Sequence, residues 1–352
     1  MHIVFLNDSM CGGGAERAMA NIVNELSKTN NIHLISLEDS FCVNLNSNIT
    51  TSYFNKNINS RVKKFFGLLI DAYKLKQFIK KNKQSVVVSF QYRSNFINII
   101  SKLIGSKHKS VVSERNYPEK SLEYLPFFSF LLKKLYPLSD IVTCNASDTK
   151  ELFTNKYGFS NVKLIFNGYN KKEILRLASM PLEDKYKSIF KKNVVLNIGR
   201  LTQQKGQAYL LEAFALLDSE KYHLLLIGKG DLEKSLHELA KKLKIEKRVF
   251  FVGYQENPYV FIEKSKVFAF SSLYEGFPNA LAEALICKTA IASFNFKSGA
   301  NDLISKKNLV DIGDITYLAR VIEEEIIEKD TTLNIYDVAN EYDLMLRQMI
   351  NK

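Results

Sequence analysis

The sequence predicts an α/β protein built from two doubly wound, Rossmann-like domains. The first observation is an alternation of short β-rich apolar runs with amphipathic helical patterns along most of the 352 residues. The second is that the alternation comes in two successive blocks, separated between residues 166 and 193 by a lysine-rich stretch without strand pattern. The third is that 46% hydrophobic residues suffice for two ordinary cores at this length. Because right-handed crossovers place helices on both faces of a parallel sheet, each block predicts one such domain.

The first block predicts an N-terminal domain over residues 1–168. Its strand-like runs span residues 2–6, 32–37, 85–90, 109–114, 140–144 and 162–166. Helical patterns lie between several of these runs, for example at 15–28 and 95–105. We therefore expect a mostly parallel sheet in this domain.

The second block predicts a C-terminal domain over residues 169–335. Its strand-like runs span 194–200, 222–228, 248–253, 266–272 and 289–294, and helical patterns cover 208–217, 231–243 and 279–286. A last helical pattern over 336–352 is expected to pack back toward the N-terminal domain. Open parallel sheets bind ligands at the carboxyl ends of their strands, so we expect the two domains to face each other across a cleft lined by loops.

The chain is basic, with 49 lysines and arginines against 37 acidic residues and a formal net charge of +12. Such an excess indicates a polyanionic partner. Residues 61–84 hold eight basic residues and one acidic residue, and their apolar residues recur at helical spacing: Phe65, Leu68, Leu69, Ala72, Leu75, Phe78 and Ile79. The segment fits a surface helix packed on a core. It also fits a helix whose lysines, Lys63, Lys64, Lys80 and Lys81, touch anionic lipid or a diphosphate-bearing acceptor. Stacking aromatics do not interleave with the basic residues, so we expect no nucleic acid partner.

The four cysteines, Cys11, Cys42, Cys144 and Cys287, are scattered without a C-x-x-C pair and without clustered histidines. This pattern favours neither a disulfide nor a zinc site, and it suits a reducing cytoplasm. The N-terminal apolar run is too short for a secretory signal, and no run approaches the roughly 18 apolar residues of a spanning helix. We therefore expect any membrane contact to be peripheral.

The loop after the first strand contains three consecutive glycines, Gly12 to Gly14, directly before a helical pattern. Glycines at a helix start let backbone N–H groups approach an anion. The spacing is not G-x-G-x-x-G, so the dinucleotide fingerprint fails. A tight turn explains the glycines equally well when the loop is considered alone.

The second domain opens with Arg200 just after its first strand-like run and Lys205 five residues later. Two cations at a strand end form a plausible diphosphate clamp, in which arginine binds two oxygens and lysine acts as a point charge. A solvated turn with two surface cations is the alternative. Because the chain contains no D-x-D pair, we expect no divalent metal, with the two cations taking its place.

The stretch EGFPNALAEAL carries Glu275 and Glu283, eight positions apart, around a turn and a helix start with Asn279 as the expected N-cap. The N–H groups of a helix start favour phosphate, and glutamates accept hydrogen bonds from hydroxyl groups. A pocket with both properties suits a nucleotide sugar. Two glutamates at this spacing are surface charges in most proteins, so the stretch alone decides nothing.

Five stretches taken together resemble family 4 of the retaining glycosyltransferases, which have the GT-B fold. They are GGGAER, IGRLTQQKG, LLLIGKGDLE, FVGYQENPY and EGFPNALAEAL. The resemblance covers residues 1 to about 305. It implies a UDP-sugar as co-substrate and no other cofactor. It also implies that the N-terminal domain binds the acceptor and that the C-terminal domain binds the nucleotide sugar.

The resemblance assigns roles to individual residues. Arg200 and Lys205 match the diphosphate-binding pair, Glu283 matches the ribose-binding glutamate, and Glu275 matches the glutamate that approaches the donor hexose. The segment Gly276, Phe277 and Asn279 runs over the sugar and phosphates. Gly13 and Gly14 match the loop that closes on the donor β-phosphate, and the backbone at Gly253 and Tyr254 reads the base. The resemblance makes Arg200, Lys205 and Glu275 the catalytic group.

Three departures from the family pattern concern the site and its surroundings. Glu114 and Arg115 stand in the region where many members have a histidine, which leaves any acid, base or acceptor-orienting role of this region open. Lys288 and Ala290 replace the usual glycine and proline. The usual glycine-rich loop is shortened to residues 305–314.

The chain most resembles bacterial members that extend polyprenyl-diphosphate-linked saccharides, which implies a UDP-hexose or UDP-N-acetylhexosamine donor, with N-acetylgalactosamine as the best candidate. We expect retention, with the acceptor attacking on the face that the diphosphate leaves and a leaving phosphate oxygen taking the proton. A glycosidase-like double displacement through glutamates, a UDP-sugar epimerase and a basic nucleic-acid-binding protein are the alternatives. The expected location is the cytoplasm, at the inner face of the membrane.

Overall fold

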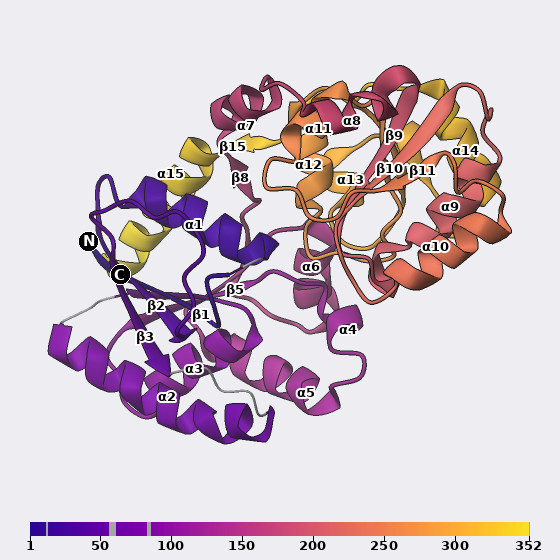
Figure 1. The fold of residues 1–352 in the computed structure, drawn as a ribbon. Coiled ribbons are helices and arrows are strands. Elements are labelled where there is room, and N and C mark those ends of the chain that lie inside the picture. The colour runs from indigo at the N-terminus through magenta and orange to yellow at the C-terminus, as the bar shows by residue number, and fades with distance from the viewer. Residues whose placement is uncertain (12, 56–60, 83–85, 352) are drawn as a thin grey trace. The chain divides into compact units, whose positions relative to one another are not determined.

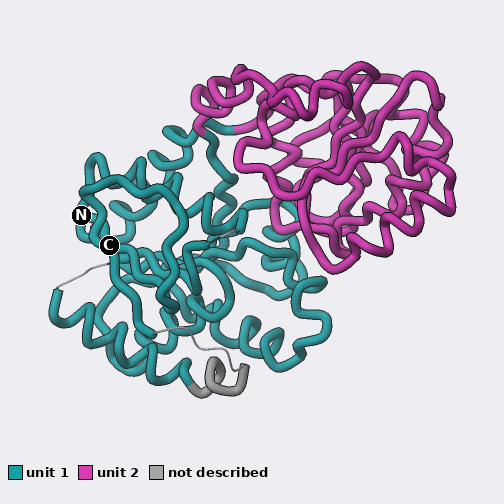
Figure 2. The backbone as a smooth tube through the Cα atoms, in the orientation of Figure 1, with its two compact units in different colours: residues 1–169, 333–352 teal, residues 170–332 magenta. Residues whose placement is uncertain are grey.

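The computed structural model describes residues 1–11, 13–55, 61–82 and 86–351, except for the side chains of residues 61–66. It divides into two compact units (Figure 2). Unit 1 contains Met1–Tyr169 and Leu333–Lys352, and unit 2 contains Asn170–Thr332. Each unit is a parallel sheet between helices, so the predicted α/β class with two doubly wound domains is confirmed (Figure 1).

Unit 1 is built on a seven-stranded sheet in the order β3-β2-β1-β4-β5-β6-β7. Its strands are β1 (His2–Asn7), β2 (Asn31–Glu38), β3 (Thr50–Asn55), β4 (Val86–Phe90), β5 (Lys109–Glu114), β6 (Ile141–Cys144) and β7 (Val162–Leu164). Its helices are α1 (Gly14–Leu26), α2 (Arg61–Asn82), α3 (Tyr92–Leu103), α4 (Pro118–Ser121), α5 (Pro126–Leu135), α6 (Ser147–Glu151) and α15 (Ile335–Ile350). All of the strand pairs are parallel.

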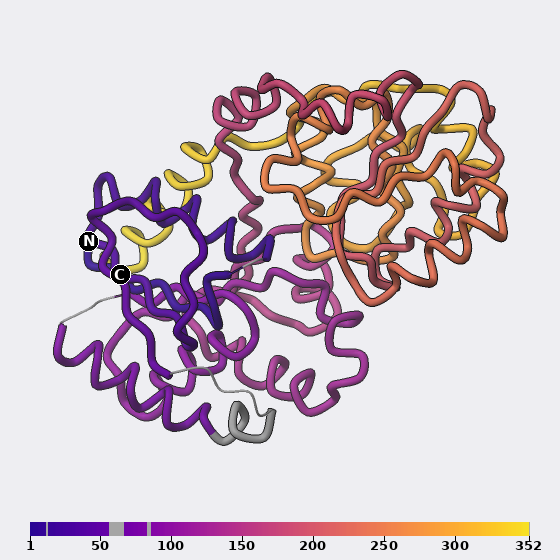
Figure 3. Tube along the Cα trace, in the orientation of Figure 1, coloured from indigo at the N-terminus to yellow at the C-terminus, as the bar shows by residue number. Residues whose placement is uncertain are grey.

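The central strands of unit 1 are buried on both faces, because their side chains alternate between two cores. Ile3 and Phe5 of β1 belong to the core shared with α1 and α15, whereas Val4 and Leu6 belong to the core shared with α2, α3 and α5. Helix α15 reaches the first core through residues such as Tyr342, and its chain returns beside the N-terminal segments (Figure 3). The predicted packing of the last helix toward the N-terminal domain is confirmed.

Unit 2 is built on a six-stranded parallel sheet in the order β11-β10-β9-β12-β13-β14. Its strands are β9 (Asn193–Ile198), β10 (Tyr222–Ile227), β11 (Val249–Phe251), β12 (Val267–Phe270), β13 (Ala290–Phe294) and β14 (Leu309–Val310). Its helices are α7 (Lys171–Ala178), α8 (Asp184–Lys187), α9 (Gln207–Ala215), α10 (Glu233–Lys242), α11 (Tyr259–Lys264), α12 (Asn279–Ile286), α13 (Ala300–Leu303) and α14 (Ile315–Glu324). Two short strands, β8 (Gly168–Tyr169) and β15 (Leu333–Asn334), pair where the chain leaves and re-enters unit 1.

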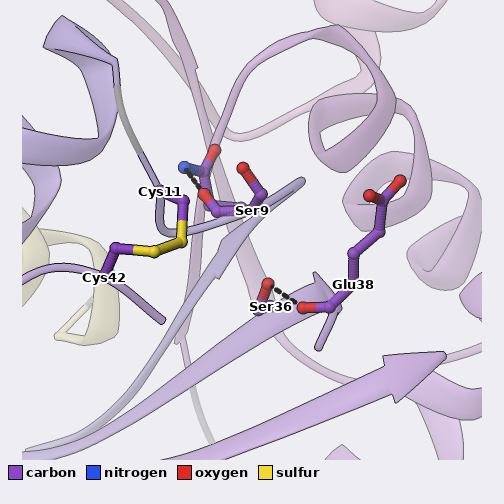
Figure 4. The surroundings of a disulfide bond; sticks show 6 residues. Ser9, Cys11, Ser36, Glu38 and Cys42 are labelled. Atoms are coloured by element: carbon purple, nitrogen blue, oxygen red, sulfur yellow. Dashed lines mark hydrogen bonds between the residues drawn. A yellow bond between two sulfur atoms is a disulfide. The ribbon is translucent and has the colours of Figure 1, made fainter. Parts of the chain in front are cut away.

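The disulfide expectation is wrong, because Cys11 and Cys42 form a disulfide with Cα atoms 4.7 Å apart (Figure 4). The two cysteines are 31 residues apart in sequence, but β1 and β2 are neighbouring parallel strands and the loops that follow them meet. Backbone hydrogen bonds from Met10 to Ser40 and from Cys42 to Met10 hold these loops together. Sequence spacing cannot show this proximity, whereas the strand order does.

The basic helix predicted at 61–84 is α2, and Phe65 of its predicted apolar face lies outside the described side chains. Among the described side chains the burial pattern follows the prediction with one exception. Leu68, Ala72, Leu75 and Ile79 are buried, but Leu69 is 65% exposed, so its assignment to the apolar face is wrong. The buried face of α2 is narrower than the predicted apolar face, and Leu69 lies outside it.

Candidate active site

The loop after β9 holds Lys205 in a fixed position against the loop after β12. Gly206 has φ +61°, and a Cβ there would lie 2.1 Å from the carbonyl oxygen of Ser271. The Ser271 hydroxyl donates to the Lys205 carbonyl at 2.9 Å, and the Leu273 N–H donates to the Gln204 carbonyl at 2.8 Å. A glycine at position 206 is therefore required both by the backbone angle and by the close approach of the two loops.

Lys205 and Glu275 form an ion pair in this position. The Lys205 Nζ lies 2.6 Å from the Glu275 Oε1, and their side chains are 18% and 9% exposed. The structure thus brings together the predicted phosphate-binding cation and the predicted hexose-binding carboxylate. The diphosphate and hexose roles of the two residues stay predictions.

The stretch after Glu275 is fastened to the loop that follows β13. The Glu275 N–H donates to the Lys297 carbonyl at 3.0 Å, and the Ser298 hydroxyl donates to the Gly276 carbonyl at 3.0 Å. Phe277 is buried in this stretch. Hydrogen bonds between the two strand exits thereby fix the loop that precedes α12.

Helix α12 begins at Asn279, with Pro278 rather than Asn279 at the N-cap, so the expected cap was one residue off. Glu283 lies in the second turn of α12 and is buried, and Tyr259 of α11 donates its hydroxyl to the Glu283 Oε1 at 3.4 Å. A carboxylate on a buried helix face, bonded to a neighbouring helix, has a defined direction. Its ribose-binding role stays a prediction.

Arg200, Gly253 and Tyr254 lie at the carboxyl ends of β9 and β11 in the same sheet. Arg200 is exposed, and none of the ion pairs found among the described residues includes its guanidinium. Gly253 has φ +68° and accepts a hydrogen bond from the Gly228 N–H at 2.9 Å, while Tyr254 is 73% exposed. The β9 and β11 exits thus present an exposed cation and an exposed aromatic ring at one edge of the unit 2 sheet.

Gly13 and Gly14 lie in unit 1, at the N-cap and first residue of α1, and Gly12 lies outside the described residues. The N-cap has φ −110°, an ordinary angle, so the glycine at position 13 is not required by the backbone. Two residues without a predicted role are connected to it: the Glu16 carboxylate lies next to Gly13, and the Gln91 side chain donates to that carboxylate at 2.8 Å. Glu16 belongs to the quoted GGGAER stretch, whereas nothing in the sequence marks Gln91.

Glu114 ends β5 and is fully buried. It accepts the N–H groups of Arg115 and Asn116 at 2.9 and 3.0 Å and the Tyr136 hydroxyl at 3.0 Å. Burial raises the pKa of the Glu114 carboxyl to about 7, although these hydrogen bonds lower it. The carboxyl thus fixes the start of the loop after β5.

Arg115 is 5% exposed and connects three parts of unit 1. Its guanidinium donates to the Asn167 Oδ1 at 2.7 Å and to the Tyr342 hydroxyl at 2.8 Å, and it lies 4.0 Å from the centre of the Phe90 ring. The contacts found for Arg115 are therefore internal to the unit, and the acceptor role of this region stays a prediction.

The lysines assigned to a membrane or acceptor lie on α2. Lys80 and Lys81 are exposed, and the side chains of Lys63 and Lys64 lie outside the described residues. In the part of the chain that the structure describes, no helix is long and apolar enough to cross a membrane. The same described residues contain no group of three or more histidine, cysteine, aspartate or glutamate side chains that could hold a metal ion.

Two Rossmann-like units, one of them with cations and carboxylates at the carboxyl ends of its strands, define the class of GT-B glycosyltransferases. The chain matches the model of Glycosyltransferase Family 4 over residues 12–173 and the model of Glycosyl transferases group 1 over residues 181–340. Solved structures share the fold, including sucrose-phosphate synthase from Thermosynechococcus elongatus (TM-score 0.80, 16% identity, 100% of both chains). Another is Anabaena HepE in complex with UDP (TM-score 0.72, 20% identity, 100% of this chain and 98% of that chain).

Two curated relatives come from Campylobacter jejuni. One, N-acetylgalactosamine-N,N'-diacetylbacillosaminyl-diphospho-undecaprenol 4-alpha-N-acetylgalactosaminyltransferase, is 30% identical over 84% of this chain and 81% of its own length. The other, GalNAc-alpha-(1->4)-GalNAc-alpha-(1->3)-diNAcBac-PP-undecaprenol alpha-1,4-N-acetyl-D-galactosaminyltransferase, is 30% identical over 92% of this chain and 88% of its own length. The chain belongs to the family 4 glycosyltransferases and is a glycosyltransferase.

Proposed function

We propose that the protein transfers a hexose or N-acetylhexosamine, with N-acetylgalactosamine as the first candidate, from a UDP-sugar to a polyprenyl-diphosphate-linked saccharide, with retention and without a divalent metal. The ion pair of Lys205 and Glu275 carries this proposal. It places a cation suited to diphosphate beside a carboxylate suited to sugar hydroxyls. Both Campylobacter relatives are named for transferring N-acetylgalactosamine to diphospho-undecaprenol-linked sugars, which supports the choice of sugar and acceptor.

In the proposed reaction the bond between the anomeric carbon and the diphosphate oxygen breaks, and the electron pair leaves with the UDP. Arg200 and Lys205 stabilise the negative charge that grows on the diphosphate. The acceptor hydroxyl bonds to the anomeric carbon on the same face and gives its proton to the departing phosphate oxygen. Glu275 positions the hexose and Glu283 the ribose, so neither acts as a nucleophile.

The test is a screen of UDP-sugars with an undecaprenyl-diphosphate-linked saccharide, following donor consumption and the anomeric configuration of the product. We expect consumption of UDP-N-acetylgalactosamine only when acceptor is present, in the presence of a chelator, with an α-linked product. Consumption of donor without acceptor, a requirement for added metal or an inverted product would each overturn the corresponding part of the proposal.

A peripheral contact of unit 1 with anionic membrane completes the proposal. Lys80 and Lys81 of α2 are exposed, and the segment at α5 exposes Tyr124, Leu125, Phe127 and Phe130 by 88%, 48%, 48% and 56%. Two exposed lysines, Lys133 and Lys134, follow in the last turn of α5. Exposed aromatic and aliphatic side chains beside lysines are suited to an anionic lipid surface.

Vesicle sedimentation tests this contact with vesicles of anionic and of zwitterionic lipid. Lys80→Glu with Lys81→Glu should weaken binding to anionic vesicles, and Phe127→Ser with Phe130→Ser should weaken the binding that persists at high salt. The control in unit 2 for the charge change is Lys241→Glu with Lys242→Glu, at two exposed lysines. The control for the apolar change is Leu216→Ser, at one exposed apolar residue. Equal losses in the controls, or no binding by the unchanged protein, would refute the membrane contact.

A further inference from the structure

The loop after β2 is a fixed support for Cys42. Cys42 itself is exposed, but alternate residues around it pack against the core that α1 and α15 share. These residues are Phe41, Val43 and Leu45. Asn24 of α1 fastens the loop further on, because its amide donates to the Asn44 carbonyl at 2.9 Å and its Oδ1 accepts the Asn46 N–H at 2.9 Å. Cys42 is therefore held in place without its disulfide.

The loop after β1 is bound to this support up to Met10. The Met10 N–H donates to the Ser40 carbonyl at 3.0 Å, and the Met10 carbonyl accepts the Cys42 N–H at 3.0 Å. Cys11 comes next, half-buried, and the disulfide joins it to Cys42 (Figure 4). Since α1 begins at Gly14, the disulfide adds a restraint to the chain just before this helix. The two loops stay together through Met10 when the disulfide opens.

The disulfide is accessible to thiols on its Cys42 side, whereas the other two cysteines are poorly reactive. Burial raises the pKa of the Cys144 thiol and of the Cys287 thiol to about 12. Exposed disulfides are reduced more readily than protected ones, and regulatory disulfides belong to this class. In the reducing cytoplasm expected for this protein, disulfides are usually transient and redox-sensing. Cys11 and Cys42 are therefore the pair suited to reversible thiol–disulfide exchange.

We propose that Cys11 and Cys42 form a reversible redox switch, which a dithiol reductant opens and oxidised glutathione closes, and that the closed form binds the UDP-sugar more tightly. The proposal rests on the proposed function, because Gly13 and Gly14, just after Cys11, have a predicted role toward the donor diphosphate. A chain segment that is already restrained loses less conformational freedom when a ligand binds. Reduction removes this restraint at Cys11 and leaves the hydrogen bonds of Met10 in place.

Reduction of the switch takes two exchange steps. A thiolate of the reductant attacks the Sγ of Cys42, the exposed partner, and the S–S bond breaks. The electron pair leaves on the Cys11 Sγ, which takes up a proton. The second thiol of the reductant then displaces Cys42 from the mixed disulfide, so the reductant becomes a disulfide and both cysteines become thiols. Oxidised glutathione reverses the reaction and is itself reduced to two molecules of glutathione.

The test equilibrates the folded protein in glutathione buffers of graded redox ratio, with and without UDP. An alkylating reagent then traps the free thiols, and mass spectrometry gives the fraction of protein with the disulfide. By thermodynamic linkage, UDP shifts this equilibrium by the same factor by which the two forms differ in UDP affinity. We expect a shift of about fivefold toward the disulfide, and a Kd for UDP about fivefold lower in calorimetric titration of the oxidised protein than of the reduced protein.

Cys11→Ser with Cys42→Ser should bind UDP as the reduced protein does and should not respond to the redox buffer. Cys144→Ser is the matched control, because it removes a buried free cysteine, and it should behave as the unchanged protein does. If the double variant does not fold, the unchanged protein reduced with dithiothreitol gives the same comparison.

Equal UDP affinities of the oxidised and reduced forms would show that the disulfide is purely structural and would overturn the switch. A disulfide that dithiothreitol opens only in denaturant would overturn it too. If neither form binds UDP and no UDP-sugar is consumed, the proposed function itself fails. The trapped thiols still show in that case whether the exchange occurs in the folded protein, so the two failures are distinguishable.

Discussion

Lys205 and Glu275 lie 70 positions apart in the sequence, and their charged groups are 2.6 Å apart in unit 2. The cation assigned to the donor diphosphate is therefore neutralised by the carboxylate assigned to the donor hexose. Because both side chains are largely buried, removal of either partner leaves a charge with little access to water. Stability and donor binding thus depend on the same two residues.

Lys205→Ala should abolish transfer and also destabilise the protein. The buried Glu275 carboxylate loses its partner, and the free energy of unfolding should fall by about 3 kcal/mol. The double variant Lys205→Ala with Glu275→Gln should recover most of that loss, because no lone charge remains, while transfer stays absent. Chemical denaturation and a transfer assay measure the two effects separately.

Lys171→Ala serves as the control for this pair. Lys171 and Asp330 form a 2.8 Å ion pair and lie near the first and last residues of unit 2. The side chains of Lys171 and Asp330 are each about one quarter exposed, so Lys171→Ala should lower the free energy of unfolding less than Lys205→Ala does. Transfer should continue. A double variant at 205 and 275 that is no more stable than Lys205→Ala would contradict the coupling of the two residues.

Arg200→Ala should separate activity from stability. Arg200 is exposed, and no ion pair among the described residues includes it, so its removal should change the free energy of unfolding by less than about 0.5 kcal/mol. Loss of one charge-stabilising donor from the leaving group should lower kcat by about 100-fold. Denaturation curves that shift as strongly as those of Lys205→Ala would show that Arg200 has a structural role instead.

The placement of the candidate site residues of unit 2 was largely predictable, because each follows a recognisable strand-like run. The carboxyl ends of neighbouring parallel strands meet at one edge, so strand exits alone indicated that Arg200, Lys205 and Glu275 share that edge. Sequence could not show that Lys205 and Glu275 touch, because that distance is set by the close packing of Gly206 against Ser271. Gln91 gave no signal, since an unusual backbone angle (φ 69°) at a non-glycine residue leaves no mark in composition.

Strands were predictable from the sequence where they are apolar and were missed where they are polar or very short. Strand β3, Thr50–Asn55, was missed because it is a half-exposed edge strand of mostly polar residues. The two-residue strand β14 was missed because it is too short to form a run. The disulfide was missed for a different reason, because the contact between Cys11 and Cys42 depends on the order of strands in the sheet.

Gly206→Ala should be far more damaging than Gly158→Ala. Both glycines have positive φ, +61° and +71°, so each substitution costs about 1 kcal/mol of backbone strain. A Cβ at Gly158 meets nothing within 4 Å, whereas one at Gly206 would collide with the Ser271 carbonyl. The difference in melting temperature between the two variants measures that close approach, and only Gly206→Ala should also lose transfer, because Lys205 is displaced.

Reduction of the disulfide should destabilise unit 1. A disulfide that closes a loop of 31 residues restricts the unfolded chain and thereby raises the free energy of unfolding by about 3 to 4 kcal/mol. Cys11→Ser with Cys42→Ser should therefore lower the melting temperature and make it insensitive to dithiothreitol, whereas Cys144→Ser, at a buried free cysteine, should retain the sensitivity. An unchanged protein that melts identically with and without dithiothreitol would contradict the bond.

Glu114 should make the protein less stable as the pH rises from about 4.5 to about 7. Burial raises the pKa of its carboxyl from 4.5 in the unfolded chain to about 7 in the folded protein. In this range the folded protein holds a proton that the unfolded chain has released, so the free energy of unfolding falls with rising pH, by up to about 1.4 kcal/mol per pH unit. Glu114→Gln keeps an acceptor for the Arg115 and Asn116 N–H groups but cannot ionise, so its stability should fall less steeply across that range. Urea denaturation at several pH values measures the slope of the free energy of unfolding against pH for both proteins. The difference between the two slopes is the contribution of Glu114, because all other titrating groups are the same. Parallel slopes for the two proteins would show that Glu114 remains ionised when buried.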